Sequence, residues 1–169
     1  LSGSRLVQRR KINVLSQPLP GVCRIWDMAD QLQVVTIDGP SGVGKSTISR
    51  RVAAQLGFTY LDTGAMYRAV ALKCKYAGVD LDDTEALQGI LDTLEMKLIP
   101  AQDEGEDVQV ELDGVNVSDQ IRTPEISMLA SAVSALQPVR AKLTTMQQDM
   151  GAQGRIVAEG RDTGTVVFP

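Results

Sequence analysis

The stretch at residues 34–47, VVTIDGPSGVGKST, constrains the fold of this chain more than any other. A run of β-branched residues leads into a glycine-rich loop, and a helical pattern follows the loop. The spacing of Gly39, Gly44, Lys45 and Ser46 matches the phosphate-binding P-loop. Glycines let backbone N–H groups approach an anion, and the free N–H groups at a helix start favour a phosphate. The stretch therefore predicts a strand, a nucleotide-binding loop and a helix in an α/β fold.

This loop predicts an ATP site with an associated Mg²⁺ ion. Lys45 is expected to reach the β- and γ-phosphates and to act in catalysis, and the Ser46 hydroxyl is expected to bind Mg²⁺. The loop by itself does not indicate which second substrate receives the phosphoryl group. The residues expected to bind ATP are Gly39, Pro40, Ser41, Gly42, Val43, Gly44, Lys45, Ser46 and Thr47.

Length and composition exclude several classes of protein. A chain of 169 residues predicts one domain with room for a small insertion. The net charge of -4 argues against a general nucleic-acid binder, and the absence of histidine excludes histidine-based acid–base catalysis. Cys23 and Cys74 have no metal-binding spacing, and no apolar run approaches the length of a membrane span. We therefore expect a cytoplasmic protein.

The N-terminal segment, residues 1–27, is predicted to be a flexible extension without a catalytic role. It contains a breaker cluster at 18–21 (PLPG), and its apolar stretch is too short for a signal peptide. The basic cluster at 9–11 (RRK) leaves a partner-binding arm as the alternative. The core is predicted to begin at residue 28.

Hydrophobic periodicity predicts alternating strands and helices in the core. A first strand at 33–38 is expected to be buried on both faces, and Met66 and Tyr67 are expected to pack in the core. The strand ending at Glu159 is expected to be central, with one edge left unpaired. Further strands are predicted at 58–61 and 155–159, and helices at 45–56 (apolar residues Ile48, Val52 and Leu56), 65–77, 123–133, from 82 onward and from 138 to about 151.

Residues 95–118 show a different period and predict a small antiparallel meander. Alternating apolar residues surround Asp113-Gly114, which is a strong signal for a two-residue hairpin. The acidic stretch at 103–107 is predicted to be an exposed loop.

Polar clusters follow two of the predicted strands, at 62–64 (DTG) and 159–162 (EGRD). Because the carboxyl ends of parallel strands meet at one crevice, these clusters and the P-loop are expected to share a site. Glu159 is the candidate to support Mg²⁺ through water, and Arg68, Arg140 and Arg161 could hold a second phosphate group. These observations indicate a P-loop phosphotransferase or NTPase.

Four segments together resemble the bacterial cytidylate kinase family: 37–46 (IDGPSGVGKS), 62–68 (DTGAMYR), 121–123 (IRT) and 159–169 (EGRDTGTVVFP). The resemblance extends from about residue 28 to residue 169. It implies the nucleoside monophosphate kinase architecture, which is a P-loop NTPase-type parallel sheet with helices on both faces and a small antiparallel insert. The region 95–136 would be the monophosphate-binding insert. The activity implied is transfer of the ATP γ-phosphoryl group to CMP or dCMP.

The resemblance also implies roles for individual residues. Thr63 and Arg68 would approach the acceptor phosphate, and Arg161 would contact the acceptor nucleotide and act in catalysis beside Lys45. The cytosine would be read by Ser131, Arg140 and Asp162. The protein is expected to act on free nucleotides as a monomer, without nucleic-acid or membrane partners.

The sequence departs from the family in that the family continues past the position of residue 169. An arginine-rich lid and the last βα elements of the sheet have no counterpart, so we expect the chain to be a fragment, incomplete at its C-terminus and nearly inactive alone. Two alternatives stay open. One is another small-molecule P-loop kinase of the adenylate or shikimate type, and the other is a non-catalytic ATP-binding module. The residues do not distinguish CMP from dCMP.

Overall fold

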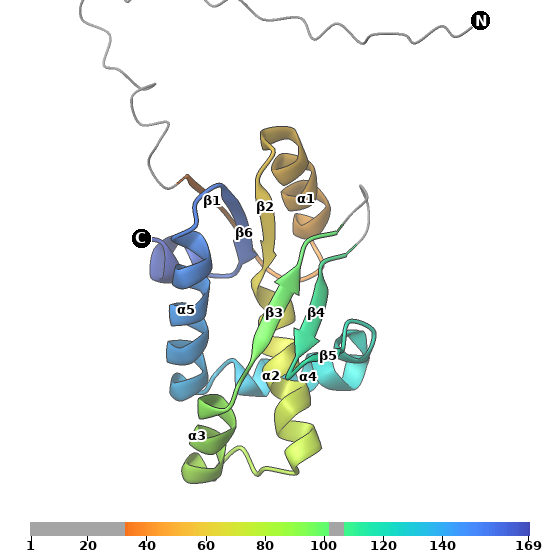
Figure 1. Cartoon of the computed structure of the whole chain (residues 1–169), viewed down its shortest axis with the longest axis vertical. Coiled ribbons are helices and arrows are strands. Elements are labelled where there is room, and N and C mark those ends of the chain that lie inside the picture. The colour runs from red at the N-terminus through yellow and green to blue at the C-terminus, as the bar shows by residue number, and fades with distance from the viewer. Residues whose placement is uncertain (1–32, 102–106) are drawn as a thin grey trace, which may run out of the picture. The chain divides into compact units, whose positions relative to one another are not determined.

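The computed structural model describes residues 33–101 and 107–169, all within the unit Gln31–Pro169 (Figure 1). The predicted extension at 1–27 lies outside the described residues, and so does the predicted acidic loop except for Asp107.

The main sheet has three parallel strands in the order β1-β6-β2, comprising β1 (Val34–Asp38), β6 (Ile156–Gly160) and β2 (Thr59–Asp62) (Figure 1). Asp38 stands opposite Gly160 on one side of β6, and Asp62 stands opposite Glu159 on the other. The carboxyl ends of the three strands therefore lie on the same side of the sheet, which brings their polar terminal residues together. The central position predicted for the strand of Glu159 is confirmed.

Two expectations about strand environment are wrong. β1 is half-buried, and Asp38 at its end is exposed, because β1 pairs with β6 alone among the described strands. The edge expected to be unpaired on β6 is paired, since β6 has β1 on one side and β2 on the other. The two edge strands of the described sheet are therefore β1 and β2.

Helix α1 (Lys45–Leu56) has the predicted bounds and ends at Gly57, whose left-handed conformation closes the helix. Its expected apolar face is not buried, because Ile48 is 57% exposed and Leu56 is 46% exposed. Ser49 and Ala53 are the buried residues of this helix. The helix lies against the sheet through its small side chains, which allow a closer approach than the branched ones.

Helix α2 (Thr63–Ala77) is the centre of the hydrophobic core. Asp62 caps it by accepting a hydrogen bond from the backbone N of Ala65 at 2.9 Å. Met66 and Val70 are fully buried, as predicted for this face. Three further helices contribute to the same core: α3 (Thr84–Asp92), α4 (Pro124–Val133) and α5 (Gln137–Gly151).

A second, antiparallel sheet forms the predicted meander from β3 (Met96–Ile99), β4 (Gln109–Leu112) and β5 (Val115–Asn116). Asp113 and Gly114 both have positive φ, at 49° and 81°, as the tight hairpin requires. Val110 and Leu112 are buried in the core cluster that also contains α2. A 3₁₀ turn, η2 (Gln120–Arg122), then leads into α4.

The described fold is α/β, with a parallel sheet covered by helices on both faces and a small antiparallel sheet, as predicted. In residues 33–101 and 107–169, no helix is long and apolar enough to cross a membrane.

Candidate functional site

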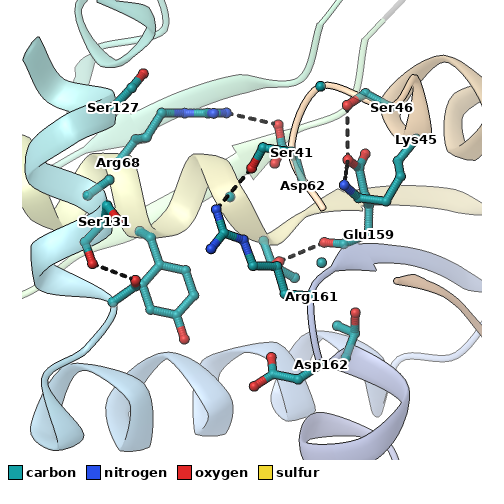
Figure 2. Close-up of a pocket in the computed structure, with 18 of the residues that line it drawn as sticks. Ser41, Lys45, Ser46, Asp62, Arg68, Ser127, Ser131, Glu159, Arg161 and Asp162 are labelled. Atoms are coloured by element: carbon teal, nitrogen blue, oxygen red, sulfur yellow. Dashed lines mark hydrogen bonds and ion pairs between the residues drawn. The ribbon is translucent and has the colours of Figure 1, made fainter. Parts of the chain in front are cut away.

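A cavity of about 610 Å³ lies at the carboxyl ends of the parallel strands (Figure 2). Its size is typical of a site for a small ligand. It is lined by the loop before α1 and by residues of α1, α2, α4, α5 and the segment after β6. Gly39, Pro40 and Val43 are the predicted ATP residues that do not line it. The predicted residues that do are Ser41, Gly42, Gly44, Lys45, Ser46, Thr47, Thr63, Arg68, Ser131, Arg140, Glu159, Arg161 and Asp162.

The loop has the backbone conformation that its glycines permit. Gly42 and Gly44 have φ values of 81° and 85°, which other residues rarely adopt. Gly44 precedes α1, whose start carries no side-chain cap, so its first N–H groups are available to an anion. The Nζ of Lys45 donates a hydrogen bond to the carbonyl oxygen of Pro40 at 2.6 Å, so this side chain folds back over the loop.

Glu159 connects the loop to the sheet. Its side chain is only 11% exposed, and the Ser46 hydroxyl donates to its Oε1 at 3.0 Å. The Nζ of Lys45 lies 4.0 Å from the same oxygen, and the Tyr60 hydroxyl donates to Oε2. Burial raises the pKa of Tyr60, and the charges of Asp62 and Glu159 raise it further. The phenol is therefore neutral and serves as a hydrogen-bond donor.

The oxygens of Ser46 and Glu159 suit Mg²⁺. A hydroxyl and a carboxylate oxygen are hard ligands, and Mg²⁺ in nucleotide sites takes few protein ligands while keeping phosphate and water oxygens. The described residues contain no group of three or more His, Cys, Asp or Glu side chains that could hold a metal by themselves. The pair therefore fits an ion that arrives with a nucleotide better than a resident metal.

The opposite wall of the cavity carries Arg68, which extends from α2 toward Asp62 (Figure 2). Its Nη2 lies 3.3 Å from Oδ2 of Asp62, and its Nε is buried without a hydrogen-bond partner in the described part of the chain. Thr63 donates to the backbone oxygen of Glu159 at 2.6 Å, which aligns the start of α2 with the end of β6. A guanidinium with unused donors at this wall is suited to an anionic ligand.

Arg140 on α5 and Asp162 after β6 form an ion pair, with Nη2 2.6 Å from Oδ2. The hydrogen bond to Asp162 raises the pKa of Arg140, and the carboxylate's charge adds to this. Ser131 on α4 lines the same cavity. The structure therefore brings these three predicted residues to one region.

Arg161 extends toward the loop from the other side. Its Nη2 donates to Oγ of Ser41 at 2.9 Å (Figure 2). The segment after β6 and the P-loop are thus in direct contact.

The sequence interpretation did not assign two of the residues that line the cavity. Tyr67 packs against the core as expected, but it is only half-buried and also lines the cavity. Burial raises the pKa of Tyr67, which keeps it neutral. Gln147 is 2% exposed and lines the cavity about two turns along α5 from Arg140. A polar residue within the apolar pattern of that helix was the signal that could have identified Gln147.

Comparison with known proteins identifies the family of this chain. The profile of a family described as "Cytidylate kinase" matches residues 35–169. The chain belongs to the cytidylate kinase family. The resemblance predicted from the sequence is confirmed, and every predicted site residue lies inside the matched range.

Three individual relatives are similar to this chain in sequence. The chain is 52% identical to a cytidylate kinase of Syntrophotalea carbinolica over 136 residues, covering 80% of this chain and 57% of that protein. It is 46% identical to a cytidylate kinase of Pasteurella multocida over 136 residues, covering 80% of this chain and 59% of that protein. A bifunctional pantoate ligase/cytidylate kinase of Synechococcus sp. (strain RCC307) is 48% identical over 152 residues, covering 88% of this chain and 29% of that protein. The match thus spans little more than half the length of the two relatives named as cytidylate kinases.

Proposed function

We propose that the protein containing this chain transfers the γ-phosphoryl group of ATP to CMP or dCMP, forming ADP and CDP or dCDP. The observation that carries this proposal is one cavity lined by both the P-loop and the Arg140–Asp162 pair, in a chain of the cytidylate kinase family. A donor site and an acceptor site that share one cavity are what a direct phosphoryl transfer requires.

The P-loop side of the cavity is assigned to ATP. The free N–H groups at the start of α1 and the ammonium of Lys45 bind the phosphates, and Lys45 exchanges the Pro40 carbonyl for a phosphate oxygen. Ser46 would hold Mg²⁺ directly and Glu159 would hold it through water. When bound, Mg²⁺ would offset the negative charge that develops during transfer.

The other side of the cavity is assigned to the acceptor nucleotide. Thr63 and Arg68 approach its phosphate, while Ser131, Arg140 and Asp162 read the cytosine. A carboxylate accepts from the exocyclic amino group of cytosine, and an arginine donates to its ring nitrogen and carbonyl oxygen. Arg161 lies between the two substrates, where it contacts the acceptor and shares with Lys45 the charge of the transferred group.

This chemistry needs no general base. The attacking oxygen belongs to a phosphate that is already anionic near neutral pH, so orientation and charge compensation account for catalysis. The described site matches this requirement, since cationic groups of Lys45, Arg68, Arg140 and Arg161 surround the cavity. We expect the protein to act on free nucleotides in the cytoplasm as a monomer.

An acceptor screen tests the proposal. ADP release by the full-length protein is measured with ATP, Mg²⁺ and either CMP, dCMP, UMP, AMP or shikimate. We expect the highest kcat/KM with CMP or dCMP. A preference for AMP or shikimate would indicate a different small-molecule kinase. ATP binding without turnover of any acceptor would indicate a non-catalytic nucleotide-binding protein.

A further inference from the structure

Asp38, at the end of β1, holds the segment that follows β6. Its Oδ1 accepts hydrogen bonds from the backbone N of Thr163, at 2.9 Å, and from the Thr163 hydroxyl. Its Oδ2 accepts a hydrogen bond from the backbone N of Gly164 at 2.8 Å. One carboxylate on the strand before the P-loop therefore binds three donors on the segment that carries Arg161 and Asp162.

The packing around this contact leaves little freedom. A Cβ atom on Gly164 would lie 2.5 Å from Oγ1 of Thr36 and 3.4 Å from Oδ2 of Asp38, so the backbone there lies directly against β1. The neighbouring backbone adds a further link, since the N of Gly39 donates to the oxygen of Gly160 at 3.2 Å. Thr163 also begins a π-helical turn, η3 (Thr163–Val167), whose backbone bonds return to the Asp162 carbonyl from Thr165 and Val166.

We propose that Asp38 is a positioning residue whose carboxylate fixes Thr163 and Gly164, and thereby sets the place of Asp162 and Arg161 relative to the P-loop. The inference rests on the proposed function, because that function assigns Asp162 and Arg161 to the acceptor nucleotide.

Two observations separate this role from direct contact with substrate. Asp38 is not among the described residues that line the cavity, whereas Asp162, Arg161 and Thr163 are. Both of its carboxylate oxygens already accept hydrogen bonds from the chain itself. Burial acts to raise the pKa of Asp38, but the bonds from Thr163 and Gly164 and the charge of Lys45 lower it more, so the carboxylate is ionised at neutral pH.

The test compares Asp38→Ala with Thr163→Val and Thr163→Ser in the full-length protein. In Asp38→Ala we expect KM for CMP to rise about tenfold or more, because charge-assisted bonds to the segment are lost. We also expect the ratio of kcat/KM for CMP to that for UMP to fall, and the Kd for ATP to change much less than KM for CMP. Thr163→Val reproduces part of the effect, Thr163→Ser restores the hydroxyl donor and the wild-type KM, and Asp38→Ala with Thr163→Val is no worse than Asp38→Ala alone.

Asp149→Ala is the matched control, since Asp149 is exposed on α5 and makes no side-chain hydrogen bond within the described ranges. A second readout, independent of catalysis, is hydrogen exchange of the Thr163 and Gly164 amides without nucleotide. It should be faster in Asp38→Ala than in Asp149→Ala.

The outcomes distinguish the two proposals. An unchanged KM for CMP, an equal loss of ATP affinity, or unchanged exchange at Thr163 and Gly164 would overturn the role of Asp38. A wild-type protein that does not phosphorylate CMP would overturn the proposed function, while faster exchange in Asp38→Ala would still support the anchoring of the segment. If Asp38→Ala does not fold, the test is the KM for CMP of Thr163→Val compared with that of Thr163→Ser.

Discussion

Arg140 and Asp162 form an ion pair in the lining of the cavity, with Nη2 of the arginine 2.6 Å from Oδ2 of the aspartate. Their side chains are 40% and 39% exposed, so the pair by itself adds at most about 1 kcal/mol to stability. Oδ1 of Asp162 accepts no hydrogen bond from the described residues. The pair therefore orients a carboxylate that still has an oxygen available to a ligand.

Replacing Asp162 should reduce selectivity for the base. Cytosine presents an amino donor where uracil presents an oxygen, and a buried polar group left unpaired costs roughly 1–3 kcal/mol. In Asp162→Ala we expect the ratio of kcat/KM for CMP to that for UMP to fall, with Asp149→Ala as the control. An unchanged ratio in an active variant would show that Asp162 does not read the base.

Lys45 should be essential for turnover. Its ammonium lies at the loop, 2.6 Å from the Pro40 oxygen, and its removal deprives the ATP phosphates of a charge partner. Lys45→Ala is expected to abolish ADP release and weaken ATP binding, measured by calorimetry. Lys97→Ala is the control, because Lys97 is on the exposed surface of β3 and pairs with Glu111. Wild-type turnover in Lys45→Ala would refute the P-loop assignment.

Tyr60 should affect the Mg²⁺ dependence of the reaction. Tyr60→Phe removes the donor to Oε2 of Glu159 but leaves the bond from Ser46. Loss of one hydrogen bond to an ionised carboxylate predicts an increase of about 10-fold or more in the Mg²⁺ concentration for half-maximal rate. The measurement is a Mg²⁺ titration of the initial rate, and Tyr76→Phe, at an exposed tyrosine, is the control. Equal titrations for the wild type and Tyr60→Phe would exclude a role for this hydroxyl at the metal.

The hairpin residue Asp113 should make stability depend on pH. Burial acts to raise the pKa of Asp113, but the hydrogen bonds from Lys73 and from the backbone N of Glu95 lower it more. Because the folded pKa is lowered, the ionised group stabilises the fold above its unfolded pKa of about 3.9. That contribution disappears as the pH falls through the lower folded value.

Asp113→Asn tests this directly, since asparagine also tolerates the positive φ of the turn. At neutral pH we expect the free energy of unfolding in urea to be lower in Asp113→Asn than in the wild type. The decrease should be less than about 1 kcal/mol, because the side chain is exposed. The difference should vanish in acid. A difference that does not change with pH would assign the effect to turn geometry instead of charge.

Local patterns were sufficient to predict the bounds of α1 and the hairpin at Asp113, because each depends on neighbouring residues. They did not predict which stripe of α1 faces the sheet. Two sets of residues have helical spacing: Ile48, Val52 and Leu56, and Ser49 and Ala53. The short distance between α1 and the sheet determines that the smaller side chains, Ser49 and Ala53, are the buried ones.

Sequence motifs predicted many of the residues that line the cavity, and the family resemblance added Ser131 and Arg140, which lie outside those motifs. Lys45, Glu159 and Asp162 lie in recognisable segments and reach one cavity. The contacts of Asp38 with Thr163 and of Tyr60 with Glu159 join residues about a hundred or more positions apart, so no local pattern contains them. The exposure of Tyr67 to the cavity likewise depends on how α2 lies beside α5 and the segment after β6.

The strand order has a consequence for how this chain folds during synthesis. Among the described strands, β1 and β2 each pair with β6 and not with each other, although β6 comes last along the chain. None of the hydrogen bonds between strands of the main sheet can form before residues 156–160 have left the ribosome. The α2 core and the antiparallel sheet depend on closer neighbours and can form earlier, whereas pairing of distant segments is slow. The cavity at the carboxyl ends of these strands is therefore incomplete until residues 159–163, which form part of its lining, have been synthesised.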